Sequence, residues 1–272
     1  MPEIAEVETV RNILKKQILF KKIINVNIIY PKMIESDLVE FKNVLIGNKF
    51  IDIKRIGKWL LFELEKHYLV SHLRMEGKFN LKQSNEEIIR HEHVIISFEG
   101  NLDLRYNDTR KFGRMNLIKK EELYNIPAIK NQGIEPLDKN LNSDYLLDKF
   151  KNKKTPIKTV LLDQTIISGL GNIYANEVLY AAKINPLKPA GSLTKAECDE
   201  LVKSSRKIIK KAIAMGGTTI NSYTSALGIT GHYQDELKVH KKESNECPLC
   251  HHKIKREKVN GRSTYYCEHC QK

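Results

Sequence analysis

Four cysteines near the end of the chain have the spacing of a metal site. They are Cys247, Cys250, Cys267 and Cys270, in the pattern C-x2-C-x16-C-x2-C. Each pair can hold one metal ion from a tight turn, and the two pairs together complete the tetrahedron that Zn²⁺ prefers. Because four thiolates leave no position for a substrate, the pattern predicts one structural Zn²⁺ and no catalytic metal.

Two alternatives to four-cysteine zinc ligation remain at this point. The cysteines could form two disulfides, as in small secreted proteins. The start of the chain has neither the basic nor the apolar region of a secretory signal, which favours zinc. A neighbouring histidine (His251, His252 or His269) could also replace one thiolate. The fifth cysteine, Cys198, lies in a helical pattern, and we expect it to be packed.

Pro2 is the second candidate for chemistry, because it directly follows Met1. Removal of the initiator methionine would expose a secondary amine, and α-amino groups titrate far below lysine. Such an amine can attack a sugar C1′ and form a cationic iminium. Glu3 and Glu6 share one helical face and could supply acid–base catalysis beside it. Since Met-Pro starts are common, this hypothesis depends on the rest of the chain.

Three regions with different residue patterns must position these residues. Apolar residues at helical spacing predict a helix over 3–19. From 22 to 120, short β-branched or alternating segments between glycines are typical of a β-sandwich or barrel. After a linker at 125–136, helical texture returns. The predicted helices are 144–152, 155–165, 172–183 and 194–215.

A loop over 216–238 precedes the cysteine-rich module. Strand-like segments at 253–259 and 262–266 flank Asn260-Gly261, which is a strong hairpin signal. Arg262 is therefore expected at the tip of a zinc-braced hairpin, where it could enter a DNA groove or simply be solvated.

The charge balance favours a polyanionic partner. The chain of 272 residues has 46 Lys+Arg against 33 Asp+Glu, a formal net charge of +13. No apolar run approaches the length of a membrane span, so we expect no membrane association.

These features together resemble the bacterial formamidopyrimidine-DNA glycosylases of MutM type. The resemblance runs from Met1 to the terminal cysteines. Its motifs lie at 2–8, 57–58, 72–77, 106–113, 169–177, 216–219 and the four cysteines. It implies an α+β multidomain fold with a β-sandwich and leading helix (1–130), a helix–two-turn–helix DNA-binding domain (131–238) and a four-cysteine zinc finger (239–272).

The resemblance implies a bifunctional DNA glycosylase and AP lyase in base excision repair. Its substrate would be double-stranded DNA with oxidised purines or abasic sites. Pro2 would be the nucleophile, Glu3 the proton donor, Glu6 a supporting carboxylate and Lys58 a second catalytic cation. The resulting iminium would drive β- and then δ-elimination.

The DNA contacts are implied in the same way. Met75, Arg110 and Phe112 would fill the gap left by the flipped nucleotide. Asn172 and Arg262 would clamp flanking phosphates, which positions the strand without reading sequence. Two further assignments are His72 as a phosphate contact and a lesion-covering loop with Thr218, Thr219 and Tyr223.

The sequence departs from the family pattern at three positions. Ala5 stands where proline is usual, Asn221 where many relatives carry arginine, and His240 where tyrosine is common. These departures concern base recognition and one phosphate contact.

Two other functions remain as alternatives. An endonuclease VIII-type enzyme would act on oxidised pyrimidines, but that branch does not typically carry Arg110-Lys111-Phe112. A non-catalytic zinc-containing protein could bind lesions without cutting. By resemblance, we expect a cytoplasmic, nucleoid-associated bacterial monomer.

Overall fold

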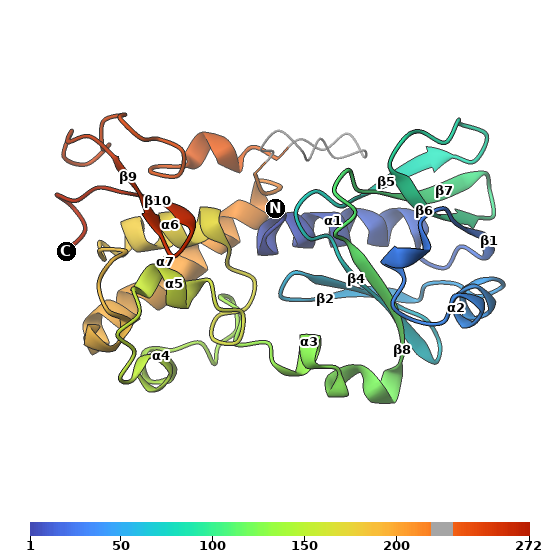
Figure 1. Ribbon diagram of the computed structural model, residues 1–272, viewed down its shortest axis with the longest axis horizontal. Helices are drawn as coiled ribbons and strands as arrows, with labels where there is room; N and C mark the ends of the chain where they lie inside the picture. The colour runs from blue at the N-terminus through green and yellow to red at the C-terminus, as the bar shows by residue number, and fades with distance from the viewer. Residues whose placement is uncertain (219–230) are drawn as a thin grey trace. The chain divides into compact units, whose positions relative to one another are not determined.

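The computed structural model describes residues 1–218 and 231–272, and the chain divides into two compact units. The first unit comprises Met1–Lys130 and Gly216–Gly231, and the second comprises Asn131–Met215 and His232–Lys272. Figure 1 shows the first unit mainly in blue and green and the second in yellow-green to red. No helix in the described ranges is long and apolar enough to cross a membrane.

Two antiparallel four-stranded sheets make up most of the first unit. Their strand orders are β1-β6-β7-β5 and β2-β3-β4-β8. The strands are β1 (Ile23–Ile28), β2 (Asp52–Ile56), β3 (Trp59–Glu63), β4 (His67–His72), β5 (Lys78–Gln83), β6 (Glu92–Phe98), β7 (Leu102–Asn107) and β8 (Arg114–Lys119). Many positions are β-branched or aromatic, which favours the half-buried pleated surface of a sheet.

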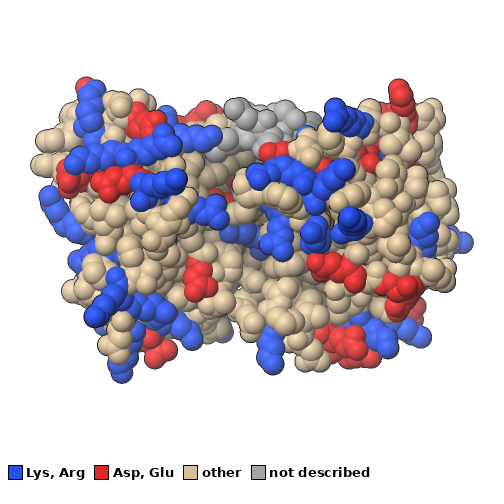
Figure 2. All heavy atoms as spheres, viewed as in Figure 1, with Lys and Arg blue, Asp and Glu red and all other residues tan. Residues whose placement is uncertain are grey.

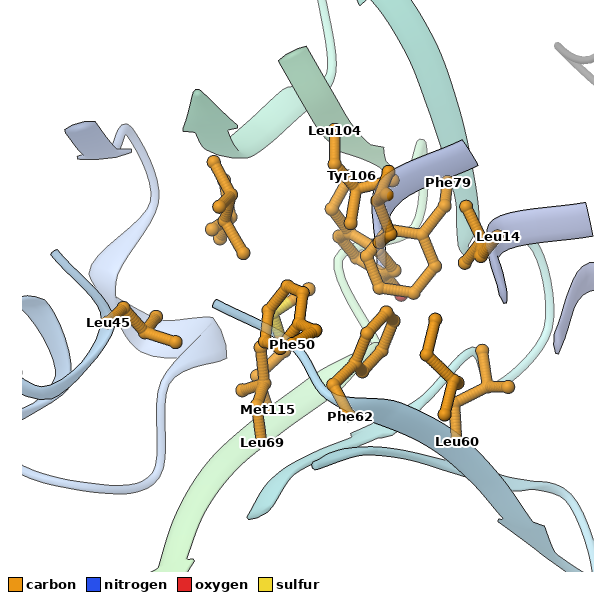
Figure 3. Close-up of a cluster of buried hydrophobic side chains, with 14 of the residues drawn as sticks. Leu14, Leu45, Phe50, Leu60, Phe62, Leu69, Phe79, Leu104, Tyr106 and Met115 are labelled. Carbon is orange, nitrogen blue, oxygen red and sulfur yellow. The ribbon is translucent and has the colours of Figure 1, made fainter. Parts of the chain in front are cut away.

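One hydrophobic core joins the two sheets, as Figure 3 shows. Phe62 on β3 lies between Phe50 and Phe79, with ring centroids 5.1 Å and 5.4 Å apart, respectively. Since Phe79 belongs to β5, aromatic side chains from both sheets pack together. The predicted β-sandwich is confirmed.

Helix α1 (Ile4–Ile18) leads into this sandwich and packs an apolar stripe against the core. Helix α2 (Leu38–Leu45) lies within the predicted β-rich region 22–120 and was not predicted. The missed signal is Asp37, whose carboxylate accepts hydrogen bonds from the N–H groups of Val39 and Glu40. A short helix, α3 (Pro127–Lys130), also lies within the predicted linker.

The second unit contains the predicted helices. They are α4 (Ser143–Phe150), α5 (Ile157–Leu161), α6 (Asn172–Ala181) and α7 (Lys195–Ala214). Helix α5 ends four residues before the predicted boundary at 165. The almost fully buried α6 packs against α7 and against the terminal hairpin, so it is the centre of this unit.

The terminal module is the predicted hairpin. Strand β9 (Lys255–Val259) pairs with β10 (Arg262–Tyr266), and Val259 lies opposite Arg262. The turn residues Asn260 and Gly261 have φ of 44° and 77°, as a tight hairpin turn requires. The predicted fold class, a β-sandwich followed by a helical domain and a zinc finger, is confirmed.

Candidate active site and nucleic-acid interface

The N-terminus of α1 holds Pro2 and the two glutamates together. Pro2 is buried, and Glu3 is the residue that caps the helix. Glu3 and Glu6 form a reciprocal capping box, in which the Glu3 N–H donates to Glu6 Oε2 at 2.9 Å. The peptide that follows Pro2 is therefore fixed by a buried carboxylate.

The second oxygen of Glu6 connects α1 to a distant part of the chain. Glu6 Oε1 accepts the backbone N–H of Thr218 at 2.7 Å and its hydroxyl at 3.0 Å. Gly217 has φ of +75°, and a Cβ built there would lie 2.7 Å from Glu6 Oε1, so only glycine fits. Thr218 thus lies beside α1, whereas Thr219, Asn221 and Tyr223 lie outside the described residues.

Lys58 occupies the tight turn between β2 and β3, where it is buried. Arg55 ties this turn to α1, because its guanidinium donates to Gly57 O at 2.9 Å and to Glu8 Oε2 at 2.8 Å. Burial alone would raise the pKa of Glu8, but its bonds to Arg55 and Arg11 outweigh this and hold the pKa below its usual value. The helix that begins after Pro2 therefore fixes the turn that carries Lys58.

His72 ends β4 opposite Trp59, and their ring centroids are 4.6 Å apart. Burial, together with the charges of Arg74 and Lys58, lowers the pKa of His72 to about 3. The Nδ1 atom accepts the Arg74 N–H at 2.9 Å. His72 is therefore a neutral imidazole whose Nε2–H is the donor.

Arg110 and Phe112 project from the turn between β7 and β8. Both are exposed, and the guanidinium carbon of Arg110 lies 4.8 Å from the centroid of the Phe112 ring. Exposure of 47% for Phe112 excludes a core-packing role. The fully buried Asp108 holds this turn by accepting the N–H groups of Arg110 (3.0 Å), Phe112 (2.9 Å) and Gly113 (2.8 Å).

The half-buried Met75 is brought to the same end of the sandwich. Glu76 beside it accepts a hydrogen bond from the Thr109 hydroxyl, which joins the two turns. Gly77 and Gly113 both pack against Tyr106, where a Cβ added to either glycine would clash with the hydroxyl oxygen. The first unit thus brings the Met75 and Arg110–Phe112 turns together.

In the second unit, Lys158 connects α5, α6 and the terminal hairpin. Its buried ammonium group donates to Asn172 Oδ1 at 2.9 Å, Asn176 Oδ1 at 2.6 Å and Thr264 Oγ1 at 3.3 Å. The Asn172 amide also donates to Ser263 O at 3.0 Å, next to Arg262. Asn172 is thereby fixed against the strand that starts with the exposed Arg262.

Asn176 extends this network to His240. Because Asn176 Oδ1 accepts from Lys158, its Nδ2 must be the donor to His240 Nδ1, at 2.8 Å. Burial, together with the charge of Lys158, lowers the pKa of His240 to about 4. Glu177 holds the backbone here by accepting the N–H groups of Lys238, Val239 and His240.

The four cysteines lie together at the base of the hairpin. The four Sγ atoms all lie within 4.8 Å of one another. The Sγ–Sγ distance is 3.8 Å for Cys247–Cys270 and 3.4 Å for Cys250–Cys267. Tetrahedral ligation with Zn–S bonds of about 2.3 Å requires sulfur separations of about 3.8 Å. The residues fit one structural Zn²⁺, as predicted.

Basic side chains gather over this module. In Figure 2, blue spheres lie over the upper left of the view, where Figure 1 places β9 and β10. Lys255, Arg256, Lys258 and Arg262 are all exposed on these strands. Such a surface suits a phosphate backbone.

Sequence reasoning missed two residues of these sites. Asp108 lies within the motif at 106–113, but only the structure shows that its carboxylate holds the turn. Lys158 carried a signal, because it is a lysine among the apolar residues of a predicted helix. Its acceptors are contributed by segments up to 106 residues away, which no local pattern reveals.

Three family models match consecutive parts of the chain. Residues 1–115 match the formamidopyrimidine-DNA glycosylase N-terminal domain, 132–224 its H2TH domain, and 244–272 the zinc finger found in FPG and IleRS. The formamidopyrimidine-DNA glycosylases of Lactobacillus delbrueckii subsp. bulgaricus and Listeria monocytogenes are 42% and 41% identical, over the full length of both chains.

Solved structures give the same result. Lactococcus lactis Fpg has been crystallised with DNA containing N7-benzyl-Fapy-dG and with DNA containing an abasic site. Both structures match this chain with a TM-score of 0.94 and 39% identity, and the match covers 99% of each chain. By sequence and by structure, the chain belongs to the formamidopyrimidine-DNA glycosylase family.

Proposed function

We propose that this chain excises oxidised purines from duplex DNA and cleaves the strand at the resulting abasic site through a Schiff base on Pro2. The observation that carries the proposal is the position of Pro2, directly before the Glu3–Glu6 capping box of α1. The Lactococcus lactis complexes with Fapy-dG-type and abasic DNA support the substrate class.

The reaction begins when Met1 has been removed and the Pro2 amine is free. Its lone pair attacks C1′, the glycosidic bond breaks, and the departing base accepts a proton from Glu3. The amine nitrogen then loses its proton, and the C1′–O4′ bond breaks as O4′ is protonated, which opens the sugar ring and leaves a cationic iminium between Pro2 and C1′. Both Glu6 oxygens accept hydrogen bonds from Glu3 and Thr218, so Glu6 is assigned a positioning role. Lys58 contributes positive charge near the lesion.

The iminium then acts as an electron sink. Loss of the C2′ proton breaks the C3′–O3′ bond, and a second elimination breaks the C5′–O5′ bond. The sugar remnant leaves, and a one-nucleotide gap remains. The zinc ion has no part in these steps, because four thiolates fill its coordination sphere.

The DNA contacts follow from the donors described above. Met75 and Phe112 act as apolar wedges, and Arg110 hydrogen-bonds the base left unpaired. Asn172, Arg262 and the Nε2–H of the neutral His72 contact phosphates. The assignment of Thr218, Thr219 and Tyr223 to a lesion-covering loop stays a prediction, because residues 219–230 lie outside the described part of the chain.

The wider assignments belong to this proposal. We assign three domains (1–130, 131–238 and 239–272), a monomeric state and a location in the cytoplasm with the nucleoid. The relatives described above are bacterial enzymes.

Borohydride trapping tests the proposal. The purified protein is incubated with a duplex carrying 8-oxoguanine opposite cytosine, borohydride is added, and the adduct is mapped by mass spectrometry. We expect an adduct on Pro2 that is lost in Pro2→Gly. Pro127→Gly, at the start of α3, is the matched control and should retain the adduct.

Other outcomes discriminate between the alternatives. An adduct formed only with an oxidised pyrimidine would move the chain to the endonuclease VIII type. No adduct with either substrate, from zinc-loaded protein with Met1 removed, would leave a non-catalytic lesion-binding protein.

A further inference from the structure

Two histidines that the structural zinc does not use lie beside its ligands. His252 follows Cys250 by two residues, and His269 lies between Cys267 and Cys270. Because four thiolates already complete the zinc tetrahedron, neither imidazole is needed there. Both side chains are exposed, so they are accessible from solvent.

The two rings stack face to face, with centroids 4.2 Å apart and ring planes that differ by only 6°. Because a nitrogen lone pair lies in the plane of its ring, a shared ion requires one of these exposed rings to turn about its Cβ–Cγ bond. One ligand atom from each of His252, His269 and Cys250 lies within 4.8 Å of the others. Each histidine belongs to a different cysteine turn, so the zinc that fixes the turns also holds the two rings together.

A hydrogen bond sets the tautomer of His252. Its Nδ1 lies 3.1 Å from the carbonyl oxygen of Cys250. A carbonyl can only accept, so Nδ1 carries the hydrogen and Nε2 keeps its lone pair. Metal-binding histidines typically have this arrangement, in which the second ring nitrogen donates to a carbonyl or carboxylate.

The surroundings leave room for a hydrated ion. The pair lines a surface hollow of 410 Å³ together with Lys253, Lys255, Glu268 and Lys272. Glu268 pairs with Lys255, and Lys253 Nζ lies 3.9 Å from Glu246 Oε1, so carboxylates offset two of the lysine charges. Solvent further screens these exposed charges.

We propose that His252 and His269 form a second metal site on the zinc finger. It binds a divalent transition ion of the kind that imidazole prefers, namely Zn²⁺, Ni²⁺ or Cu²⁺, and water fills the remaining positions. The ion joins the two cysteine turns and stabilises the finger to the extent that it binds the folded form more tightly than the unfolded form. The site is independent of the proposed catalytic function.

Nickel binding to zinc-loaded protein without a histidine tag tests the proposal. After incubation with Ni²⁺ and gel filtration, we expect one nickel retained per chain with the zinc content unchanged. His252→Ala and His269→Ala should each lower the nickel affinity at least about tenfold. His251→Ala is the matched control, because this exposed neighbour lies outside the pair, and its affinity should equal that of the wild type.

Copper supplies a spectroscopic test of the ligands. Cu²⁺ bound to the zinc-loaded wild type should show electron paramagnetic resonance couplings to two imidazole nitrogens, and each single variant should lose one. Strand cleavage by every variant verifies that the finger is folded. Three outcomes would each overturn the proposal. The wild type could retain zinc but no nickel, the variant with both His252→Ala and His269→Ala could bind as much nickel as the wild type, or one zinc could be released for each nickel bound.

Discussion

Replacing Asp108 by asparagine tests whether one buried carboxylate sets the turn that carries Arg110 and Phe112. The amide side chain of the variant would keep a single acceptor oxygen. If this oxygen serves Phe112 and Gly113, the amide nitrogen faces the Arg110 N–H, and that bond is lost. One bond to a charged acceptor is worth about 1.5–3 kcal/mol, and the other two would each weaken by about 1 kcal/mol. We therefore expect the free energy of unfolding to fall by roughly 3.5–5 kcal/mol.

The assay is urea unfolding followed by tryptophan fluorescence. Trp59 is the single tryptophan, and it lies on β3 of the first unit, so the signal reports on this unit. Asp37→Asn is the matched control, because its carboxylate also accepts two backbone N–H bonds but is exposed. Asparagine caps helices as well as aspartate does, so this control should change stability by a few tenths of a kcal/mol.

The same variant has a functional consequence. With the turn loosened, excision from duplex DNA should slow more than cleavage of a preformed abasic site in single-stranded DNA, because only the former needs base flipping. A fall in stability of less than about 1 kcal/mol with duplex excision unchanged would refute the role of Asp108.

Three further predictions concern other contacts. Gly217→Ala should place a Cβ against Glu6 at a positive φ, and it should slow base excision more than Gly47→Ala, whose Cβ meets nothing within 4 Å; equal rates would contradict this. Lys158→Met should destabilise the second unit by about 3 kcal/mol and weaken duplex binding, because Asn172 and Asn176 lose a charged donor. Calorimetry measures the change in stability, and fluorescence anisotropy measures the change in DNA affinity. The pKa of His72 is about 3 in the folded protein and 6.5 in the unfolded chain. As the pH falls below 6.5, the unfolded chain binds a proton that the folded protein does not, so the contribution of neutral His72 to the free energy of unfolding is complete above pH 6.5 and is lost toward pH 3. Between these limits, wild type should lose up to about 1.4 kcal/mol per pH unit relative to His72→Gln, and parallel pH profiles in urea unfolding would exclude this effect.

Local patterns were sufficient to predict most elements. Helix α1, helix α7 and the β9–β10 hairpin carry their signals within a few residues, namely apolar periodicity, capping residues and Asn260-Gly261. Helix α2 was missed because its eight residues are too short to outweigh the surrounding β-rich texture.

The sequence predicted those residues of the candidate site whose type and local spacing indicate their role. The cysteine spacing predicted the zinc site, and the family motifs supplied the candidate residues. The supporting contacts stayed hidden, because Glu6–Thr218 and Lys158–Thr264 join residues 212 and 106 positions apart. Such pairs are set by tertiary packing, on which the local pattern of a single sequence gives no information.

The Glu6–Thr218 contact also orders events during synthesis of the chain. A ribosome adding about 5–20 residues per second needs roughly 10–40 s to make the 212 residues between them. During that interval the first residues lack their final partner, and an aminopeptidase can reach Met1 before Pro2 is enclosed. Removal of Met1 can therefore precede completion of the surroundings of Pro2, and a partly synthesised chain with a free Pro2 amine still lacks the Thr218 contact to Glu6.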